Sequence, residues 1–151
     1  MRQRYVLDSE WSLPATPPRC ADELQRMLRD GSAPWWPGMR IVPAIAEPAV
    51  GTTCTLIVRS PLGYRLRVDL RIVAFEPHRL IAASADGDLR GRGSVEVEAA
   101  AGGSVVRFHW DVVSEPPWMN VTAFALRPLF LAAHARVMAR GQRGLRAVVG
   151  R

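Results

Sequence analysis

Three side chains are candidates for proton transfer or for hydrogen bonding to a ligand: His134, Tyr64 and Asp88. His134 lies one helical turn from both Leu131 and Met138, so it falls on the apolar stripe of the helix expected there. Burial would lower the pKa of its imidazole, which would then donate to a ligand carbonyl or act as a general acid or base. The alternative is a core histidine that bonds a backbone carbonyl.

Tyr64 begins an alternating segment, and its phenol would either bond a ligand oxygen or simply fill the core with its ring. Asp88 lies in a glycine-flanked turn, where an aspartate commonly bonds its own backbone, and it is the weakest catalytic candidate.

Other kinds of chemistry are excluded by what the sequence lacks. All 20 basic residues are arginine, so a Schiff base and a lysine general base are ruled out. Cys20 and Cys54 lack the spacing of a zinc or redox site, which favours plain thiols in a reducing cytoplasm, with no metal and no cofactor. The glycines of residues 87–93 do not precede a helix, so they do not form a dinucleotide-binding loop.

The elements that must position these side chains are the strands of an antiparallel sheet and one long helix. Apolar and polar residues alternate over 5–13, 64–72 and 104–114, which predicts strands with one buried and one solvated face. A helix is expected over 19–30, and a long C-terminal helix follows Pro116-Pro117. Gly141 and Gly144 would weaken that last helix unless close packing requires them.

The net charge of +6 lies entirely at the C-terminal end. Residues 1–115 hold 14 arginines and 14 acidic residues, whereas residues 116–151 hold six arginines and no acidic residue. Arg136, Arg140 and Arg143 fall opposite the apolar stripe, and they form either a solvated helix face or a contact with an anionic membrane surface. Specific nucleic-acid binding is not expected, because no exposed aromatic residues are interleaved with the arginines.

No membrane-spanning segment is expected. The most apolar stretch, residues 121–139, is interrupted by Arg127, Pro128, His134 and Arg136, whereas a spanning helix needs about 20 mostly apolar residues. Residues 1–10 are charged and lack a following apolar run, so they do not resemble a signal peptide, and a cytoplasmic location is expected.

Several short motifs occur along the chain in the same order as in a known family. The sequence resembles the SRPBCC or START-like superfamily, in particular its polyketide cyclase/dehydrase-like branch. The matching pieces are Trp35-Trp36-Pro37-Gly38, Ser60-Pro61-Leu62-Gly63-Tyr64-Arg65-Leu66, Gly87-Asp88-Leu89 with Gly91 and Gly93, Trp110, Pro117-Trp118-Met119-Asn120, and His134 followed by Val137-Met138 and residues 141–145. Ala133-His134-Ala135 departs from the family, where polar neighbours often flank the histidine, as does Ser94-Val95, where an aromatic is common.

The resemblance implies an α+β helix-grip fold that makes residues 1–151 a single domain. A curved antiparallel sheet of about seven strands would wrap around the C-terminal helix, with short helices between the first two strands and a hydrophobic cavity between sheet and helix. Strand parity and the helical stripe then select the residues expected to bind a ligand, with tryptophans of the connecting loops at the mouth. These residues are Trp35, Trp36, Tyr64, Leu66, Val68, Phe108, Trp110, Trp118, Phe124, Leu131, His134 and Met138.

Two functions remain open at this point. The first is binding of a hydrophobic, aromatic or polyketide-like small molecule, to which the resemblance adds cyclase, aromatase or dehydratase activity. The second is a non-catalytic lipid or quinone carrier whose arginine-rich helix faces a membrane. The sequence leaves open whether the protein is a monomer or a homodimer, and whether it is an enzyme.

Overall fold

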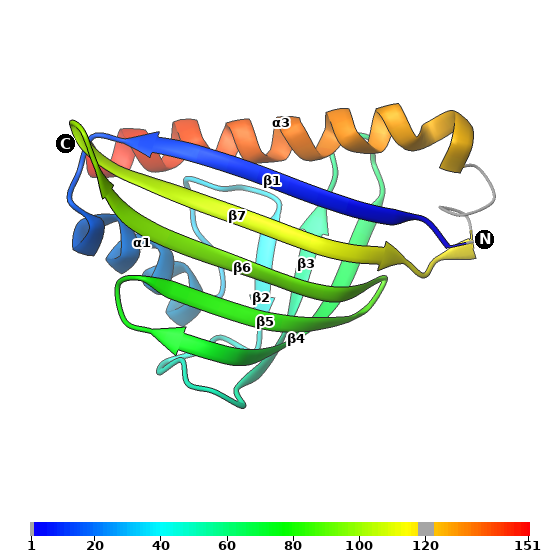
Figure 1. Cartoon of the computed structure of the whole chain (residues 1–151), viewed down its shortest axis with the longest axis horizontal. Helices are drawn as coiled ribbons and strands as arrows, with labels where there is room; N and C mark the ends of the chain where they lie inside the picture. Colours follow the sequence, from blue (N-terminus) through cyan, green and yellow to red (C-terminus); the bar gives the residue numbers. More distant parts are fainter. Residues whose placement is uncertain (1, 118–122) are drawn as a thin grey trace.

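The computed structural model describes residues 2–117 and 123–151, with the side chains of residues 123 and 124 left out. Seven antiparallel strands form one curved sheet in the order β1-β7-β6-β5-β4-β3-β2, which confirms the helix-grip α+β fold (Figure 1). The strands are β1 (Arg4–Leu13), β2 (Met39–Val42), β3 (Thr53–Arg59), β4 (Arg65–Glu76), β5 (Leu80–Gly87), β6 (Leu89–Ala100) and β7 (Gly103–Ser114).

Each strand has one buried and one exposed face, as the alternating pattern predicts. In β4, Val68 and Ile72 are buried while Arg67 and Asp69 are exposed. Opposite charges pair across strands on the exposed face, where Arg4 of β1 makes an ion pair with Asp111 of β7 at 2.9 Å. The helices therefore pack against the apolar face of the sheet.

One helix, α1 (Pro17–Asp30), connects β1 to β2, where the family resemblance implied more than one short helix. It ends at Gly31, whose positive φ of 78° allows its N–H to bond the Met27 carbonyl at 2.9 Å. The Pro34-Trp35-Trp36-Pro37-Gly38 segment that follows forms turns, because its prolines bracket the two tryptophans too closely for a second helix.

The C-terminal helix α3 (Ala123–Val149) runs beside β1, and its C-terminal end lies near α1 (Figure 1). Its buried stripe includes Phe130, Met138, Leu145 and Val149. Leu131 is an exception to the expected stripe, because it is 38% exposed at the edge of the buried face. Neither α1 nor α3 combines the length and apolar character needed to cross a bilayer, and residues 118–122 lie outside that finding.

Close packing explains the two glycines of α3. A β-carbon at Gly141 would lie 2.6 Å from the indole of Trp36 and 2.7 Å from that of Trp11, and one at Gly144 would lie 1.9 Å from the Trp35 carbonyl oxygen. The aromatic rings of Trp11, Trp36 and Phe108 contact one another, with Trp11 and Phe108 centroids 4.5 Å apart. This part of the space between sheet and helix is a solid core.

Candidate functional site

A cavity of about 150 Å³ lies between the inner face of the sheet and the Phe130–Met138 segment of α3. Its walls are mainly apolar side chains with a few hydroxyl, indole and imidazole groups, a composition typical of small-molecule sites. The lining residues are Tyr5, Leu7, Trp36, Met39, Leu56, Val58, Ser60, Tyr64, Leu66, Val68, Leu89, Phe108, Trp110, Val112, Phe130, Leu131, Ala133, His134, Val137 and Met138.

A second cavity, of about 170 Å³, lies against α1 on the same side of the sheet. Its lining includes Leu24, Met27 and Leu28 of α1 together with strand residues such as Ile81 and Val95. Met39, Leu56 and Trp110 line both cavities, so these three side chains form the partition between them.

Most of the residues expected to bind a ligand lie around the α3 cavity. Leu66, Val68, Phe108, Trp110, Leu131 and Met138 all line it. Trp110 is held there by Gly93 on the neighbouring strand, where a β-carbon would lie 2.6 Å from the indole. Glycine at position 93 therefore makes room for the aromatic ring that forms part of the cavity wall.

The two loop tryptophans differ in position. Trp36 is only 3% exposed, lines the cavity, and its indole N–H donates to the Val137 carbonyl at 3.0 Å. Trp35 stacks on Trp36 with centroids 5.6 Å apart and does not line the cavity. Trp36 is thus part of the cavity wall beside α3, and Trp35 packs against Trp36. Trp118 lies outside the described residues, and the side chain of Phe124 is likewise not described.

His134 lines the cavity and is partly buried. Burial lowers the pKa of its imidazole, which is therefore neutral at pH 7. Within the described part of the chain no hydrogen bond is made by the ring, so the expected alternative of a core histidine bonded to a carbonyl is not seen there. A neutral imidazole beside a cavity can accept or donate a proton.

Tyr64 also lines the cavity, and its ring packs edge-on against Phe130 with centroids 5.5 Å apart. The ring thus packs in the core, as one of the two roles expected from the sequence requires. Because Tyr64 also lines the cavity, this packing is compatible with a hydrogen bond from its phenol to a ligand.

Asp88 lies in the turn between β5 and β6 and lines neither cavity. Its carboxylate accepts from the Arg67 N–H at 2.8 Å, and its own N–H donates to the Arg67 carbonyl at 2.9 Å. Asp88 therefore bonds the backbone of β4 and not that of its own turn, as the sequence led us to expect of a turn aspartate, and it is not among the residues that line the cavity.

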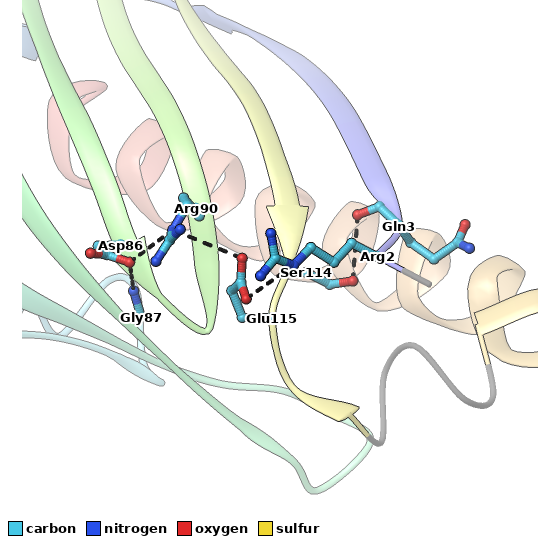
Figure 2. Close-up of polar contacts among 7 residues, drawn as sticks. All are labelled: Arg2, Gln3, Asp86, Gly87, Arg90, Ser114 and Glu115. Carbon is cyan, nitrogen blue, oxygen red and sulfur yellow. Dashed lines mark hydrogen bonds and ion pairs between the residues drawn. The ribbon is translucent and has the colours of Figure 1, made fainter.

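The same end of the sheet carries a set of outward-facing polar contacts (Figure 2). Asp86 accepts from the Gly87 N–H at 2.9 Å and from Arg90 at 3.2 Å, and these bonds lower the pKa of its carboxyl group. Arg90 also lies 3.8 Å from Glu115, which pairs with Arg2. These contacts tie the β5–β6 turn to the end of β7, and they are structural.

Tyr5 is a cavity residue that the sequence reasoning missed. It is 4% exposed and lines the α3 cavity, and among the described residues no group makes a hydrogen bond to its hydroxyl. Burial raises the pKa of the phenol, although the positive charge of Arg127 works against that rise. The signal was present, since Tyr5 shares strand parity with Leu7 and Trp11, but only the β1–β7 register places it opposite Val112.

No cluster of metal-binding side chains is present in residues 2–117 and 123–151. No three His, Cys, Asp or Glu side chains there come together in a way that would hold a metal ion. Cys20 and Cys54 are both buried free thiols, and burial raises the pKa of each.

The fold defines the chain as an α+β protein of the helix-grip type. It is similar to the Polyketide_cyc-like protein Cgl2372 from Corynebacterium glutamicum, with a TM-score of 0.59 at 16% identity over 97% of this chain and 92% of that chain. CV1439 from Chromobacterium violaceum gives a TM-score of 0.64 at 15% identity, covering 95% and 96% of the two chains. Ara h 8.0201 gives 0.63 at 15% identity, covering 97% and 98%.

These similarities confirm at the level of fold the family resemblance drawn from the short motifs. No protein-family model matches the chain, and no curated protein matches it in sequence.

Proposed function

We propose that this protein binds a hydrophobic small molecule in the cavity between the sheet and α3. The observation that carries this proposal is an apolar cavity walled by both layers of the fold, with only a few polar groups directed at it. The alternative would be a solid core without a cavity. The rings of Trp11, Trp36 and Phe108 form such a core next to the cavity, where they contact one another.

The size of the cavity restricts the ligand. Apolar cavities of about 150 Å³ are large enough to hold a single benzene ring. The α3 cavity has that volume, and the adjoining cavity is of similar size. A ligand with one ring fits the α3 cavity as it stands, whereas a longer ligand requires Met39 or Trp110 to move out of the partition.

Cyclase, aromatase or dehydratase activity is a finer form of the same proposal. Groups capable of proton transfer that line the cavity include the neutral imidazole of His134 and the phenols of Tyr64 and Tyr5. With a reactive ligand folded in the cavity, orientation would supply much of the rate enhancement and these groups the proton transfers. Asp88 has no part in this scheme, because it is bonded to the backbone outside the cavity.

A non-catalytic carrier of a lipid or quinone is the second candidate. Arg136, Arg140 and Arg143 are exposed on α3, and no acidic residue follows position 115 in the sequence. A positive helix face of this kind is attracted to anionic lipid surfaces by about 1 kcal/mol for each basic residue near the surface. The same apolar cavity would then carry the cargo.

Neighbouring alanines on α3 provide a direct test of ligand binding. Ala133 is buried and lines the cavity, whereas Ala132 is exposed. Ala133→Phe places a ring in the cavity and is expected to weaken binding of the single-ring apolar compound styrene at least tenfold, about 1.4 kcal/mol. Ala132→Phe adds the same ring to the outer face and should leave binding unchanged.

Fluorescence titration measures both affinities, and thermal unfolding checks that both variants are folded. Equal binding by folded Ala133→Phe and wild-type protein would contradict the proposal. Native mass spectrometry of gently purified protein would identify any bound metabolite.

A further inference from the structure

The hydroxyl of Tyr5 is a buried polar group without a hydrogen-bond partner among the residues that the structure describes. Its side chain is 4% exposed and lines the α3 cavity, and no described residue makes a hydrogen bond to the hydroxyl oxygen. A buried donor without a partner is uncommon and costs folding free energy, so its presence needs an explanation. Trp11 Nε1 is also unpartnered among the described residues, but Trp11 does not line either cavity.

Ring packing does not require the hydroxyl. The Tyr5 ring lies in a small apolar cluster with Val112 and Phe130, and β1 places it directly opposite Val112 on β7. Phenylalanine would make the same apolar contacts. The hydroxyl is therefore an addition to a position that packing alone would fill with a hydrocarbon side chain.

Arg127 is the charged group beside the Tyr5 ring, and its interaction with the phenol works against the rise in pKa that burial causes. Its guanidinium carbon lies 4.5 Å from the centroid of the Tyr5 ring, over the ring face, and its Nη1 donates to the Arg4 carbonyl at 3.1 Å. This geometry is a cation–π contact, and the hydroxyl oxygen makes no hydrogen bond to a described residue. The guanidinium is held in place by the strand that carries Tyr5.

The described residues that line the cavity with Tyr5 include no Asp, Glu or Arg, and Arg127 lies over the Tyr5 ring. Ser60 accepts the Leu62 N–H at 3.1 Å, and Trp36 donates to Val137. The imidazole of His134 is neutral there because burial lowers its pKa. A carboxylate ligand would lose its hydration in this cavity, and the guanidinium of Arg127 is already engaged by the Tyr5 ring and the Arg4 carbonyl, so the transfer from water is costly.

We propose that Tyr5 donates a hydrogen bond to an oxygen atom of an uncharged apolar ligand, such as a ketone, quinone or ester carbonyl. The hydrocarbon part of the ligand would lie against Val68, Phe108 and Trp110, with its oxygen directed toward β1. This inference rests on the proposed function, and it adds that the ligand is neither a plain hydrocarbon nor a carboxylate.

Three compounds of one size test the proposal. Acetophenone carries a carbonyl oxygen, α-methylstyrene replaces that oxygen with a methylene group, and benzoate replaces the methyl ketone with a carboxylate. Binding is followed through the indole N–H signals of Trp36 and Trp110 in ¹⁵N–¹H correlation spectra, because both indoles line the cavity. The quantity of interest is the ratio of the affinities for acetophenone and α-methylstyrene.

Tyr5→Phe is expected to lower that ratio by about fivefold, the value of one net hydrogen bond. Thr55→Val removes a hydroxyl from the outer sheet face, where Thr55 donates to Asp69 at 2.7 Å, and should leave the ratio unchanged. Tyr64→Phe is the comparison within the cavity, and it should change the ratio less than Tyr5→Phe does. Benzoate should bind more weakly than acetophenone.

The unliganded variant gives an independent measurement. Because no described residue makes a hydrogen bond to the hydroxyl, Tyr5→Phe should be at least as stable to thermal unfolding as the wild-type protein. A marked loss of stability, an unchanged affinity ratio, or tighter binding of benzoate would each overturn the assignment of Tyr5 while leaving apolar binding intact. If none of the three compounds bound to wild-type protein, the proposed function itself would fail.

Discussion

A β-carbon at Gly141 would lie 2.6 Å from the indole of Trp36. At the same place the Trp36 N–H donates to the Val137 carbonyl, one turn earlier on α3. The glycine therefore lets the helix approach the loop closely enough for an indole to bond its backbone. This contact ends the solid part of the core, and the α3 cavity begins on the side toward Phe130.

Gly141→Ala should destabilise the protein. Alanine favours a helix over glycine by about 1 kcal/mol, but its methyl group would overlap Trp36 and Trp11, and overpacking of this kind costs about 1–3 kcal/mol. The overlap should be the larger effect, because two rigid rings must move. Urea unfolding measures the change. Ala139→Leu adds bulk to the exposed face nearby and should change the free energy of unfolding by less than about 0.5 kcal/mol.

His134 should make stability depend on pH. Its pKa is lowered in the folded protein, whereas the unfolded chain has an ordinary histidine pKa of about 6.5. The unfolded chain therefore binds more protons below that pH, so the free energy of unfolding falls as the pH drops below about 6.5 and levels off below the folded pKa. Urea unfolding between pH 8 and pH 5 should show this fall in the wild-type protein and a smaller one in His134→Gln. Parallel curves would argue against a buried neutral imidazole.

Met39→Ala should join the two cavities. Met39 lines both, so its truncation opens the partition, at a cost in stability of about 2 kcal/mol. Binding of elongated trans-stilbene should improve relative to single-ring styrene. Met138→Ala enlarges only the α3 cavity and should raise the affinity for both compounds without the same preference. Direct titration with each compound measures the ratio, and an unchanged ratio in Met39→Ala would mean that Leu56 and Trp110 keep the partition closed.

The carrier hypothesis predicts an effect of the α3 arginines on membrane binding. Replacing Arg136, Arg140 and Arg143 with glutamine should reduce binding to phosphatidylserine vesicles by at least tenfold, from about 1 kcal/mol for each charge. The matched control replaces Arg65, Arg67 and Arg71, which are exposed on β4, with the same residue. Vesicle flotation compares the two triple variants. Equal losses would indicate attraction by net charge alone, and absence of wild-type binding would remove the carrier hypothesis.

Much of the fold was predictable because strand parity is a local property. The alternation from Tyr64 to Ile72 and from Ser104 to Ser114 assigns one face to the core, and the structure confirms that assignment. The sequence of the connection between β1 and β2 did not reveal that it holds one helix, α1, where several short helices were expected. Helix boundaries within a proline-rich connection depend on how Trp35 and Trp36 pack against α3, which is a tertiary effect.

The candidate site was predictable only in part, for a similar reason. Parity selects which side chains face inward, but it does not distinguish solid core from cavity wall. Trp11 and Tyr5 have the same parity on β1, yet Trp11 fills the core and Tyr5 lines the cavity. Asp88 shows a further limit, because its carboxylate bonds the backbone of Arg67 on β4, a partner that the sequence of the turn alone does not reveal.

The pairing of β1 with β7 has a consequence for how the molecule folds. Tyr5 lies opposite Val112, so β1 cannot pair within the sheet until β7 is present, and α3 follows both strands in the chain. Contacts between residues so distant in sequence slow folding, because the chain loses entropy before the contact is made. Residues of β1, β7 and α3 all line the cavity, so during synthesis it can be completed only after nearly the whole chain has been made.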